Sequence, residues 1–289
     1  MNQELRSFII SLLHKRGNVS NEDCLLFTSQ KYEKLWLNAF THKTFDKIDN
    51  YEYAEFLGDN IVNCCVGRYI VDWDSKIVSV KYLTRLKHNI TSKKQLAMIA
   101  HNSGFFKFIR LGEGTQKDPG LEYYKSLPKD ELLNDERYLS WLEDCFEAFI
   151  GTTTMVIDDN HKLRGVSFEI SYRIIKSFLD ELKISLRYED IFDAKTRYKE
   201  VCDKRWKFQG CVNTTTFKDD TGKTLHKTTV IGFPFNDQTA RDENKKVLAT
   251  ITDKVKMESQ NKACEQALDV LKNQYKIYDF PPDPYRKIN

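Results

Sequence analysis

The chain has 289 residues, of which 40% are hydrophobic and 30% are charged, and its formal net charge is +3. This length exceeds the usual size of a single domain, about 100 to 200 residues, so we expect two domains. The composition supplies enough apolar side chains for compact cores and too many charges for a membrane protein. No run approaches the roughly 20 apolar residues that span a bilayer. The apolar run at residues 8–13 is too short for a secretory signal and favours an amphipathic helix.

Seven cysteines are scattered through the sequence, and none belongs to a C-x-x-C pair of the kind that binds zinc. Their odd number and irregular spacing indicate free thiols, with oxidative pairing as the less favoured alternative. Free thiols are typical of a reducing compartment, so we expect a cytoplasmic location, with an organelle or the nucleus still open.

The charge is unevenly distributed along the chain. Residues 193–276 contain 17 Lys and Arg against 12 Asp and Glu, a net charge of +5, which leaves −2 for the rest of the total of +3. The basic part is the candidate for contact with nucleic acid. Charge alone is equally compatible with a domain that is merely kept soluble, so the motifs must decide.

The first part of the chain has the pattern of a helical domain. From the start to about residue 184, apolar residues recur at helical spacing, so we expect an all-α domain over residues 1–184. A stretch rich in glycine and polar residues interrupts this pattern and opens an insertion over residues 112–134, which we expect to be a surface loop. After a predicted helix over residues 170–182, a short connection reaches residue 193 and marks the domain boundary.

The second part, residues 193–276, is predicted to fold in the order α-β-β-β-α. The patterns indicate a helix over 194–205, strands around 209–217, 227–233 and 247–251, and a helix over 257–275. The stretch 233–246 is interpreted as an insertion before the third strand. The remaining segment, 277–289, is rich in proline and is expected to be a flexible tail.

Two segments carry carboxylates on one face of a helix. The acids in the first lie at positions 52, 55 and 59, and those in the second are Asp144 and Glu147. An acidic stripe is usually a solvated surface, but these are embedded in apolar residues, which indicates core helices. Carboxylates so placed repel one another unless a cation lies between them. Mg²⁺ prefers oxygen ligands and lowers the pKa of a bound water, so such a site would suit phosphodiester hydrolysis. By spacing alone an ordinary solvated surface is the more common alternative, because acidic pairs three residues apart occur on many helices.

These segments resemble ribonuclease III. The signature helix of that family reads E-x-x-E-F-L-G-D, and residues 52–59 match all of its fixed positions. Residues 39–44 resemble its A-x-T-H-x-S segment, with Thr44 in place of serine, and residues 144–151 resemble its D-x-x-E-A-x-I-G helix. Residues 83–87 and 96–97 match the helix that follows the signature. The resemblance therefore spans nearly the whole first domain.

The resemblance implies a Mg²⁺-dependent endoribonuclease that cuts double-stranded RNA, with Mn²⁺ able to substitute. Carried over by position, the metal ligands are Glu55, Asp59, Asp144 and Glu147. Asp59, Glu147 and the first signature residue, Glu52, are the catalytic residues that the resemblance implies.

Two further positions are assigned by the same resemblance. Phe56 corresponds to a residue that inserts into the partner subunit, which implies a homodimer whose two sites each cut one strand of a duplex. His42 corresponds to a structural position, and a lone histidine among apolar residues is more often part of a core than a general base.

Residues 193–200 resemble the opening helix of double-stranded-RNA-binding domains, and the α-β-β-β-α order agrees. Such domains recognise A-form shape through groove and phosphate contacts. The expected RNA contacts are Lys195, Arg197 and Glu200 in the first helix, His226 in the loop between strands, and Lys254, Lys256 and Lys262 around the start of the last helix. There the basic cluster of the family is diluted by neutral and acidic residues, which predicts a reduced affinity for RNA.

Two other functions stay open at this point. A catalytically inactive protein that sequesters or scaffolds double-stranded RNA is disfavoured, because it has no need of four carboxylates that repel one another. A DNA nuclease is disfavoured because the second domain type is suited to the A-form groove and its 2′-hydroxyls.

Overall fold

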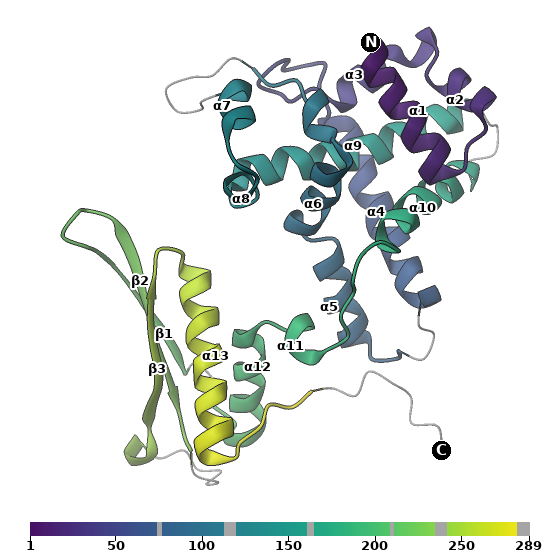
Figure 1. Cartoon of the computed structure of the whole chain (residues 1–289). Helices are drawn as coiled ribbons and strands as arrows, with labels where there is room; N and C mark the ends of the chain where they lie inside the picture. Colours follow the sequence, from purple (N-terminus) through teal and green to yellow (C-terminus); the bar gives the residue numbers. More distant parts are fainter. Residues whose placement is uncertain (74–76, 113–119, 161–164, 209–210, 235–241, 282–289) are drawn as a thin grey trace, which may run out of the picture. The chain divides into compact units, whose positions relative to one another are not determined.

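The computed structural model describes residues 1–73, 77–112, 120–160, 165–208, 211–234 and 242–281 (Figure 1). The chain divides into two compact units, of which the first spans Met1–Ile184 and the second begins at Ser185. Among the described residues, no helix is long and apolar enough to cross a membrane.

The first unit is built from helices. In chain order these are α1 (Gln3–Gly17), α2 (Asn21–Phe27), η1 (Gln30–Tyr32), α3 (Glu33–Ala39), α4 (Glu52–Trp73), α5 (Val80–Ile90), α6 (Lys93–Ser103), η2 (Phe105–Phe108), α7 (Gly120–Ser126), α8 (Lys129–Leu132), α9 (Glu136–Asn160) and α10 (Gly165–Leu179). An isolated parallel β-bridge joins Thr41 and Arg110. The prediction of a helical first domain is confirmed for the described residues.

Polar side chains cap the starts of α4 and α9, the two helices that carry the predicted carboxylates. The Asn50 side chain accepts a hydrogen bond from the N–H of Glu52 at 3.0 Å, where α4 begins. The Asp135 carboxylate accepts from the N–H groups of Arg137 at 2.9 Å and Tyr138 at 3.0 Å, where α9 begins. Such caps satisfy backbone donors that have no partner within the helix, so they define where each helix can start.

Helix α9 is buried along most of its length, and α3, α4, α6 and α10 pack around it. Two glycines let α4 and α9 approach closely. A Cβ on Gly58 would lie 1.8 Å from the carbonyl oxygen of Glu147, and a Cβ on Gly151 would lie 2.0 Å from that of Ala54. Only a residue without a side chain tolerates such backbone contact. The two glycines therefore bring the acidic segments of the two helices together.

The insertion at 112–134 differs from the surface loop that its composition predicts. Residues 113–119 lie outside the described residues, but the rest of the insertion contains α7 and α8. Tyr124 on α7 is fully buried and Leu132 on α8 is 7% exposed. The loop prediction is wrong for this part, because these two apolar side chains anchor the insertion in the helical core.

The second unit has the element order α-β-β-β-α, preceded by a short helix. Its elements are α11 (Tyr188–Ile191), α12 (Ala194–Val201), the π-helical turn η3 (Cys202–Trp206), β1 (Val212–Lys218), β2 (Thr224–Gly232), η4 (Asp242–Asn244), β3 (Lys246–Asp253) and α13 (Lys256–Tyr275). The strands form an antiparallel sheet in the order β1-β2-β3, in which Thr228 pairs with Thr214 and with Ile251. Helices α12 and α13 share a core with the sheet, centred on Tyr198, Val230 and Leu271.

The segment expected to be a flexible tail, residues 277–289, packs against the second unit at its start. Lys276 ends α13 in the left-handed conformation, at φ 56°, and turns the chain back. Ile277 is then buried and donates its N–H to the carbonyl of Leu271 at 3.0 Å, and Phe280 packs against the core of the second unit. The prediction is therefore wrong for these first residues, and residues 282–289 lie outside the described part of the chain.

Candidate active site

Helices α4 and α9 bring the predicted carboxylates to their shared interface. Glu55 and Asp144 are partly buried, and Glu147 is only 7% exposed. Glu52 and Asp59 are exposed at the edge of the same region. The five acids assigned from the sequence thus lie on the two helices that the motif glycines hold in contact.

Burial and mutual repulsion raise the pKa values of the inner carboxylates. Burial, reinforced by Asp59 and Glu143, raises the pKa of Glu147 to about 9. Burial and the neighbouring Asp144 raise the pKa of Glu55 to about 7. The pKa of Asp144 is also raised, mainly by burial. Acids whose pKa values are raised by burial and by neighbouring acids form a region where a cation would be favourable.

Glu143 belongs to this group, although no motif position pointed to it. Burial raises its pKa to about 7, against the opposing charge of Lys93, whose Nζ lies 3.8 Å from the Glu143 carboxylate. Its spacing carried a signal, because it precedes Glu147 by four residues and so shares a helix face with it. The sequence prediction missed it because it followed only the positions that the family motif fixes.

Neutral and basic side chains hold individual carboxylates. The Tyr51 hydroxyl donates to Asp144 Oδ2 at 3.0 Å, and Lys43 Nζ lies 2.8 Å from Glu52 Oε1.

Asp59 is held by a second chain of contacts. Asn63 Nδ2 donates to Asp59 Oδ1 at 2.7 Å. The Asn63 Oδ1 in turn accepts from Lys87 Nζ at 2.9 Å. The carboxylate at the edge of the acidic region is thereby tied to α5.

The side chains of this region fit a divalent cation by their chemistry more than by their present positions. Among the described residues, no three Asp, Glu, His or Cys side chains converge closely enough to hold an ion as they stand. The donor chemistry nevertheless suits a hard cation, since all the groups offer oxygen, and burial together with neighbouring acids raises the pKa values of Glu55 and Glu147. Small rotations of the side chains would be needed to bring ligands together.

A cleft of about 490 Å³ opens beside these acids. It is lined by His42, Lys43, Tyr51, Glu52, Glu55, Arg137, Ser140, Trp141 and Asp144. The His42 ring packs edge-on against Tyr51 and Trp141, and its Nδ1 lies 2.7 Å from Thr44 Oγ1. The cleft thus places two basic side chains, Lys43 and Arg137, next to carboxylates. Neither was singled out from the sequence.

The exposed side of α4 carries large apolar side chains. Phe56 is 74% exposed and Tyr53, one turn earlier, is 79% exposed. Exposed aromatics on neighbouring turns of one helix are typical of surfaces that contact another molecule.

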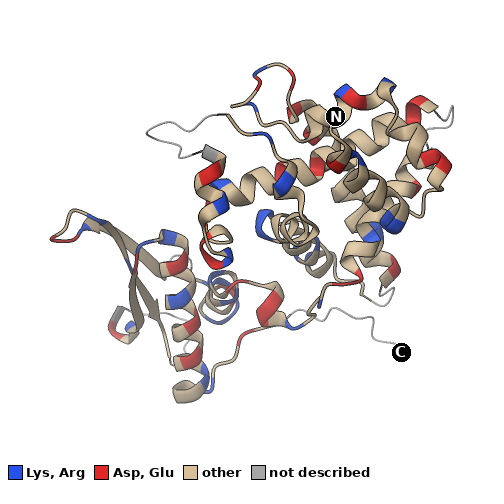
Figure 2. Ribbon diagram, turned by 45° about the horizontal axis from the view of Figure 1, so that its top comes forward, with Lys and Arg blue, Asp and Glu red and all other residues tan. Residues whose placement is uncertain are grey.

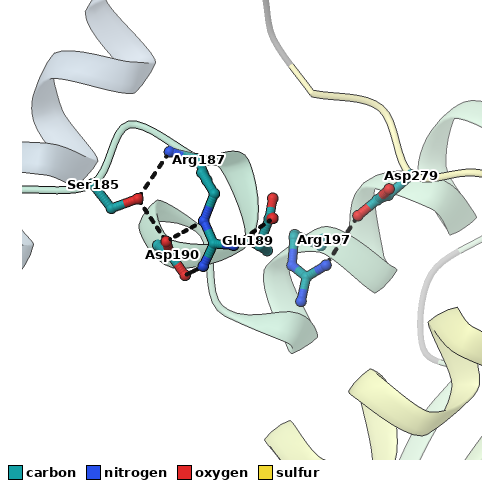
Figure 3. Close-up of polar contacts among 6 residues, drawn as sticks. All are labelled: Ser185, Arg187, Glu189, Asp190, Arg197 and Asp279. Atoms are coloured by element: carbon teal, nitrogen blue, oxygen red, sulfur yellow. Dashed lines mark hydrogen bonds and ion pairs between the residues drawn. The ribbon is translucent and has the colours of Figure 1, made fainter.

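Arg197 of the second unit does not fit its expected contact with RNA. It is 6% exposed, and its Nη1 lies 3.0 Å from Asp279 Oδ2 (Figure 3). Its Nη2 pairs with Glu265. Its Nε donates to the carbonyl of Phe192 at 3.1 Å. The prediction that Arg197 contacts RNA is therefore wrong, because a buried guanidinium held in three directions cannot reach a phosphate.

The other expected RNA contacts lie at different places on the second unit. His226 lies inside β2 and not in a loop, with its Nδ1 2.9 Å from Thr216 Oγ1, so its predicted place is wrong. Lys195 Nζ donates to Gln260 Oε1 at 2.7 Å, and Glu200 accepts from the Tyr188 hydroxyl at 3.2 Å.

The basic residues near the start of α13 differ in their surroundings. Lys262 Nζ lies 2.6 Å from Asp253 Oδ2, whereas Lys254 and Lys256 are exposed. Figure 2 shows basic and acidic residues interspersed along α13. The dilution read from the sequence is therefore also present on the folded helix.

Comparisons with known proteins bear on the first unit above all. Residues 52–156 match the family model described as "Ribonuclease III domain". The chain is 30% identical over 257 residues to a protein of Frog virus 3 (isolate Goorha) named "Putative ribonuclease 3", which covers 88% of this chain and 60% of that protein. It is 27% identical over 298 residues to the protein of the same name from Invertebrate iridescent virus 6, which covers 98% of this chain and 92% of that protein.

A solved structure, the nuclease domain of ribonuclease III from Campylobacter jejuni, is 22% identical, with a TM-score of 0.41, and covers 59% of this chain and 99% of that one. The match to the Frog virus 3 protein spans less than two thirds of that protein's length. The first unit contains a ribonuclease III domain. The chain belongs to the ribonuclease III family.

Proposed function

We propose that this protein is an endoribonuclease that hydrolyses phosphodiester bonds in double-stranded RNA with the help of Mg²⁺, for which Mn²⁺ can substitute. The observation that carries the proposal is the buried group of acids on α4 and α9. Their pKa values are raised by burial and by one another, to about 9 for Glu147 and about 7 for Glu55. A folded protein gains nothing from such repulsion unless a ligand uses it.

The proposed metal ligands are Glu55, Asp59, Asp144 and Glu147, with Glu52 as an auxiliary group. A bound cation would supply a water of lowered pKa and positive charge opposite the phosphate oxygens. The protein's own task is to hold the ligands in place. Tyr51 orients Asp144 through its hydrogen bond of 3.0 Å.

Other residues of the site would orient a ligand, contact the substrate or add negative charge. Asn63 orients Asp59 through its hydrogen bond of 2.7 Å. Lys43 and Arg137, which line the cleft, offer positive charge to a phosphate of the RNA backbone. Glu143 adds negative charge to the same region and would tighten its hold on a cation.

The second unit is the proposed RNA-binding part, with residues 193–276 as its domain and residues 1–184 as the nuclease domain. Its net charge of +5 and its α-β-β-β-α order support this role. Such a domain recognises the A-form groove by shape. Lys254 and Lys256, which are exposed, are the foremost candidates for phosphate contacts.

We further propose that the active form is a homodimer with Phe56 in its interface. Two equivalent sites related by a two-fold axis suit the two antiparallel strands of a duplex. Since Phe56 is 74% exposed in the single chain, Phe56→Ala should leave the fold of each chain intact. It should weaken self-association by about 2 kcal/mol or more, measured by sedimentation equilibrium. An unchanged dimer would remove Phe56 from the interface.

The proposed activity is tested by a cleavage assay on three substrates: a long RNA duplex, the same RNA as a single strand, and a DNA duplex of the same sequence. Each is incubated with and without Mg²⁺. Cleavage of the RNA duplex alone, and only with the cation, is expected. Cleavage of DNA would contradict the assigned substrate. Tight binding of the RNA duplex without cleavage in Mg²⁺ or Mn²⁺ would favour a sequestering or scaffolding protein.

A further inference from the structure

Helix α7, part of the insertion that none of the family motifs includes, is joined to the carboxylate cleft by one side chain. Tyr124 is fully buried. Its ring packs edge-on against Trp141, with centroids 4.7 Å apart, and runs parallel to Tyr138 at 6.4 Å. The guanidinium of Arg137 lies 5.9 Å from the centre of the same ring. All three partners lie on the first two turns of α9.

Two of these partners also line the cleft. Trp141 and Arg137 face the same 490 Å³ space as Glu55 and Asp144. Trp141 precedes Asp144 by three residues, so both side chains leave α9 on one face, a single turn apart. A shift of this turn would move the Asp144 carboxylate with it.

Aromatic contacts continue from Trp141 to the acid itself. The Trp141 ring lies 6.1 Å from that of His42, which lies 5.6 Å from that of Tyr51. The Tyr51 hydroxyl donates to Asp144 at 3.0 Å. The position of Trp141 is therefore transmitted to Asp144 by two routes, through the helix backbone and through this row of rings.

The same helical turns are also held by α6 and η2. The Tyr138 hydroxyl lies 2.7 Å from His101 Nδ1 on α6, and its ring packs against Phe106 of η2 at 4.8 Å. The start of α9 is thus held by α6 and η2 as well as by Tyr124. Removal of Tyr124 would leave a cavity against Trp141, into which the turn could relax.

We infer that the insertion is a positioning element of the nuclease site, in which Tyr124 holds Trp141 and Arg137 in the wall of the cleft and so keeps Asp144 in place for the reaction. Tyr124 is a positioning residue and does not touch the substrate. The inference rests on the proposed function for the reaction that it serves. Displacement of a reacting group by about 1 Å can cost on the order of a hundredfold in rate.

The test compares three variants of the full chain. Tyr124→Ala removes the ring, and Tyr124→Phe retains every ring contact that the inference uses. Tyr32→Ala is the matched control, because Tyr32 is also buried, but its hydroxyl contacts Asp159 and Asn160 at the other end of α9. If Tyr124→Ala does not fold, Tyr124→Leu replaces it, since leucine keeps apolar volume without the ring.

Two quantities are measured below the melting temperature of every variant. One is the single-turnover rate of duplex RNA cleavage at saturating Mg²⁺ with enzyme in excess. The other is hydrogen–deuterium exchange of residues 136–145 without RNA. Tyr124→Ala should exchange faster there and cut about 10 to 100 times more slowly. Tyr124→Phe should behave like the unmutated chain, and Tyr32→Ala should keep the cleavage rate.

Three outcomes would overturn the inference: equal losses of rate in Tyr124→Ala and Tyr32→Ala, faster exchange with an unchanged rate, or unchanged exchange in Tyr124→Ala. If the unmutated chain cuts no RNA, the proposed function fails by itself. The exchange data then still decide whether α7 holds the first turns of α9, so the two failures are distinguishable.

Discussion

Ionisable side chains are buried in both units of the molecule, and the two cases differ in their partners. In the first unit, Glu147 is 7% exposed, and the charges that shift its pKa come from other acids. In the second unit, Arg197 is 6% exposed and is held by Glu265, Asp279 and the carbonyl of Phe192. Burial is nearly the same, but only the arginine has opposite charges beside it.

This difference distinguishes a functional site from ion pairs that only stabilise the fold. A buried charge with well-placed partners can be kept as part of the fold, and losing those partners is costly. Buried charges of one sign lower stability and are kept where a ligand or a reaction uses them. On these grounds the acids of α4 and α9 are the functional candidates, whereas Arg197 serves the second unit as a structural link.

The largest expected effect is the loss of RNA cleavage when one acid of α9 is replaced. Asp144→Asn and Glu147→Gln each remove a proposed metal-binding charge while keeping the volume of the side chain. We expect each variant to lose at least about a hundredfold in cleavage rate, with duplex RNA binding nearly unchanged. The rate is followed on a labelled duplex and the binding by filter retention in Ca²⁺. Full activity of either variant in millimolar Mg²⁺ would remove that residue from the site.

The arginine of the second unit allows the opposite experiment. Replacing both acids, as in Glu265→Gln with Asp279→Asn, leaves a buried guanidinium without an opposite charge and should cost about 3 to 5 kcal/mol of unfolding free energy. Arg197→Met should cost less, about 1 to 3 kcal/mol, because the remaining acids are partly exposed and can be hydrated. Urea unfolding of the full chain measures both. A larger cost for Arg197→Met would contradict this account of the pairing.

The sequence predicted the acidic helix of the first unit but missed one of the acids near it, and the omission has a physical reason. The motif at residues 52–59 identified the acidic helix because spacing along a helix fixes which residues share a face. Glu143 was missed because the family motif does not fix its position, and the burial that raises its pKa is set by packing between helices.

The errors in the second unit and the insertion have a similar origin. Arg197 was assigned to RNA because a basic residue in a basic segment gives no sign of burial, and its partner Asp279 lies in a segment expected to be mobile. Tyr124 was placed in a loop because glycine and polar residues precede it. Local composition describes the backbone of such a stretch, whereas the ring's partners, Trp141 and Tyr138, come from another helix.

The unpaired acids should also show in the stability of the metal-free protein. The pKa of Glu147 is raised from 4.5 to about 9, because the folded protein favours the protonated carboxyl group. The folded state is therefore not penalised by Glu147 below pH 4.5, and it loses stability relative to the unfolded state as the pH rises toward 9. Glu147→Gln should therefore stabilise the metal-free chain by about 2 kcal/mol at pH 8 and by much less at pH 5. Thermal unfolding in EDTA measures both values.

Addition of Mg²⁺ provides the control for this prediction. The cation should raise the melting temperature of the unmutated chain at pH 8, because it binds the folded state, and should raise that of Glu147→Gln less. A variant that is less stable than the unmutated chain at pH 8 would show that the Glu147 carboxylate is compensated by contacts within the protein.

The smallest expected effect is on the salt dependence of RNA binding by the exposed lysines of the second unit. Lys254 and Lys256 are exposed, whereas Lys262 is paired with Asp253 at 2.6 Å. Each lysine that neutralises a phosphate releases counterions, so Lys254→Gln and Lys256→Gln should each lower the slope of log affinity against log salt by about 1. Lys262→Gln is the matched control and should change the slope by less, because its charge is already engaged by Asp253. The slopes come from RNA duplex binding between 50 and 200 mM salt, roughly the range over which such contacts lose most of their affinity. Equal slopes for all three variants would mean that the pair with Asp253 opens when RNA binds, and the distinction between engaged and available charges would then hold only for the RNA-free protein.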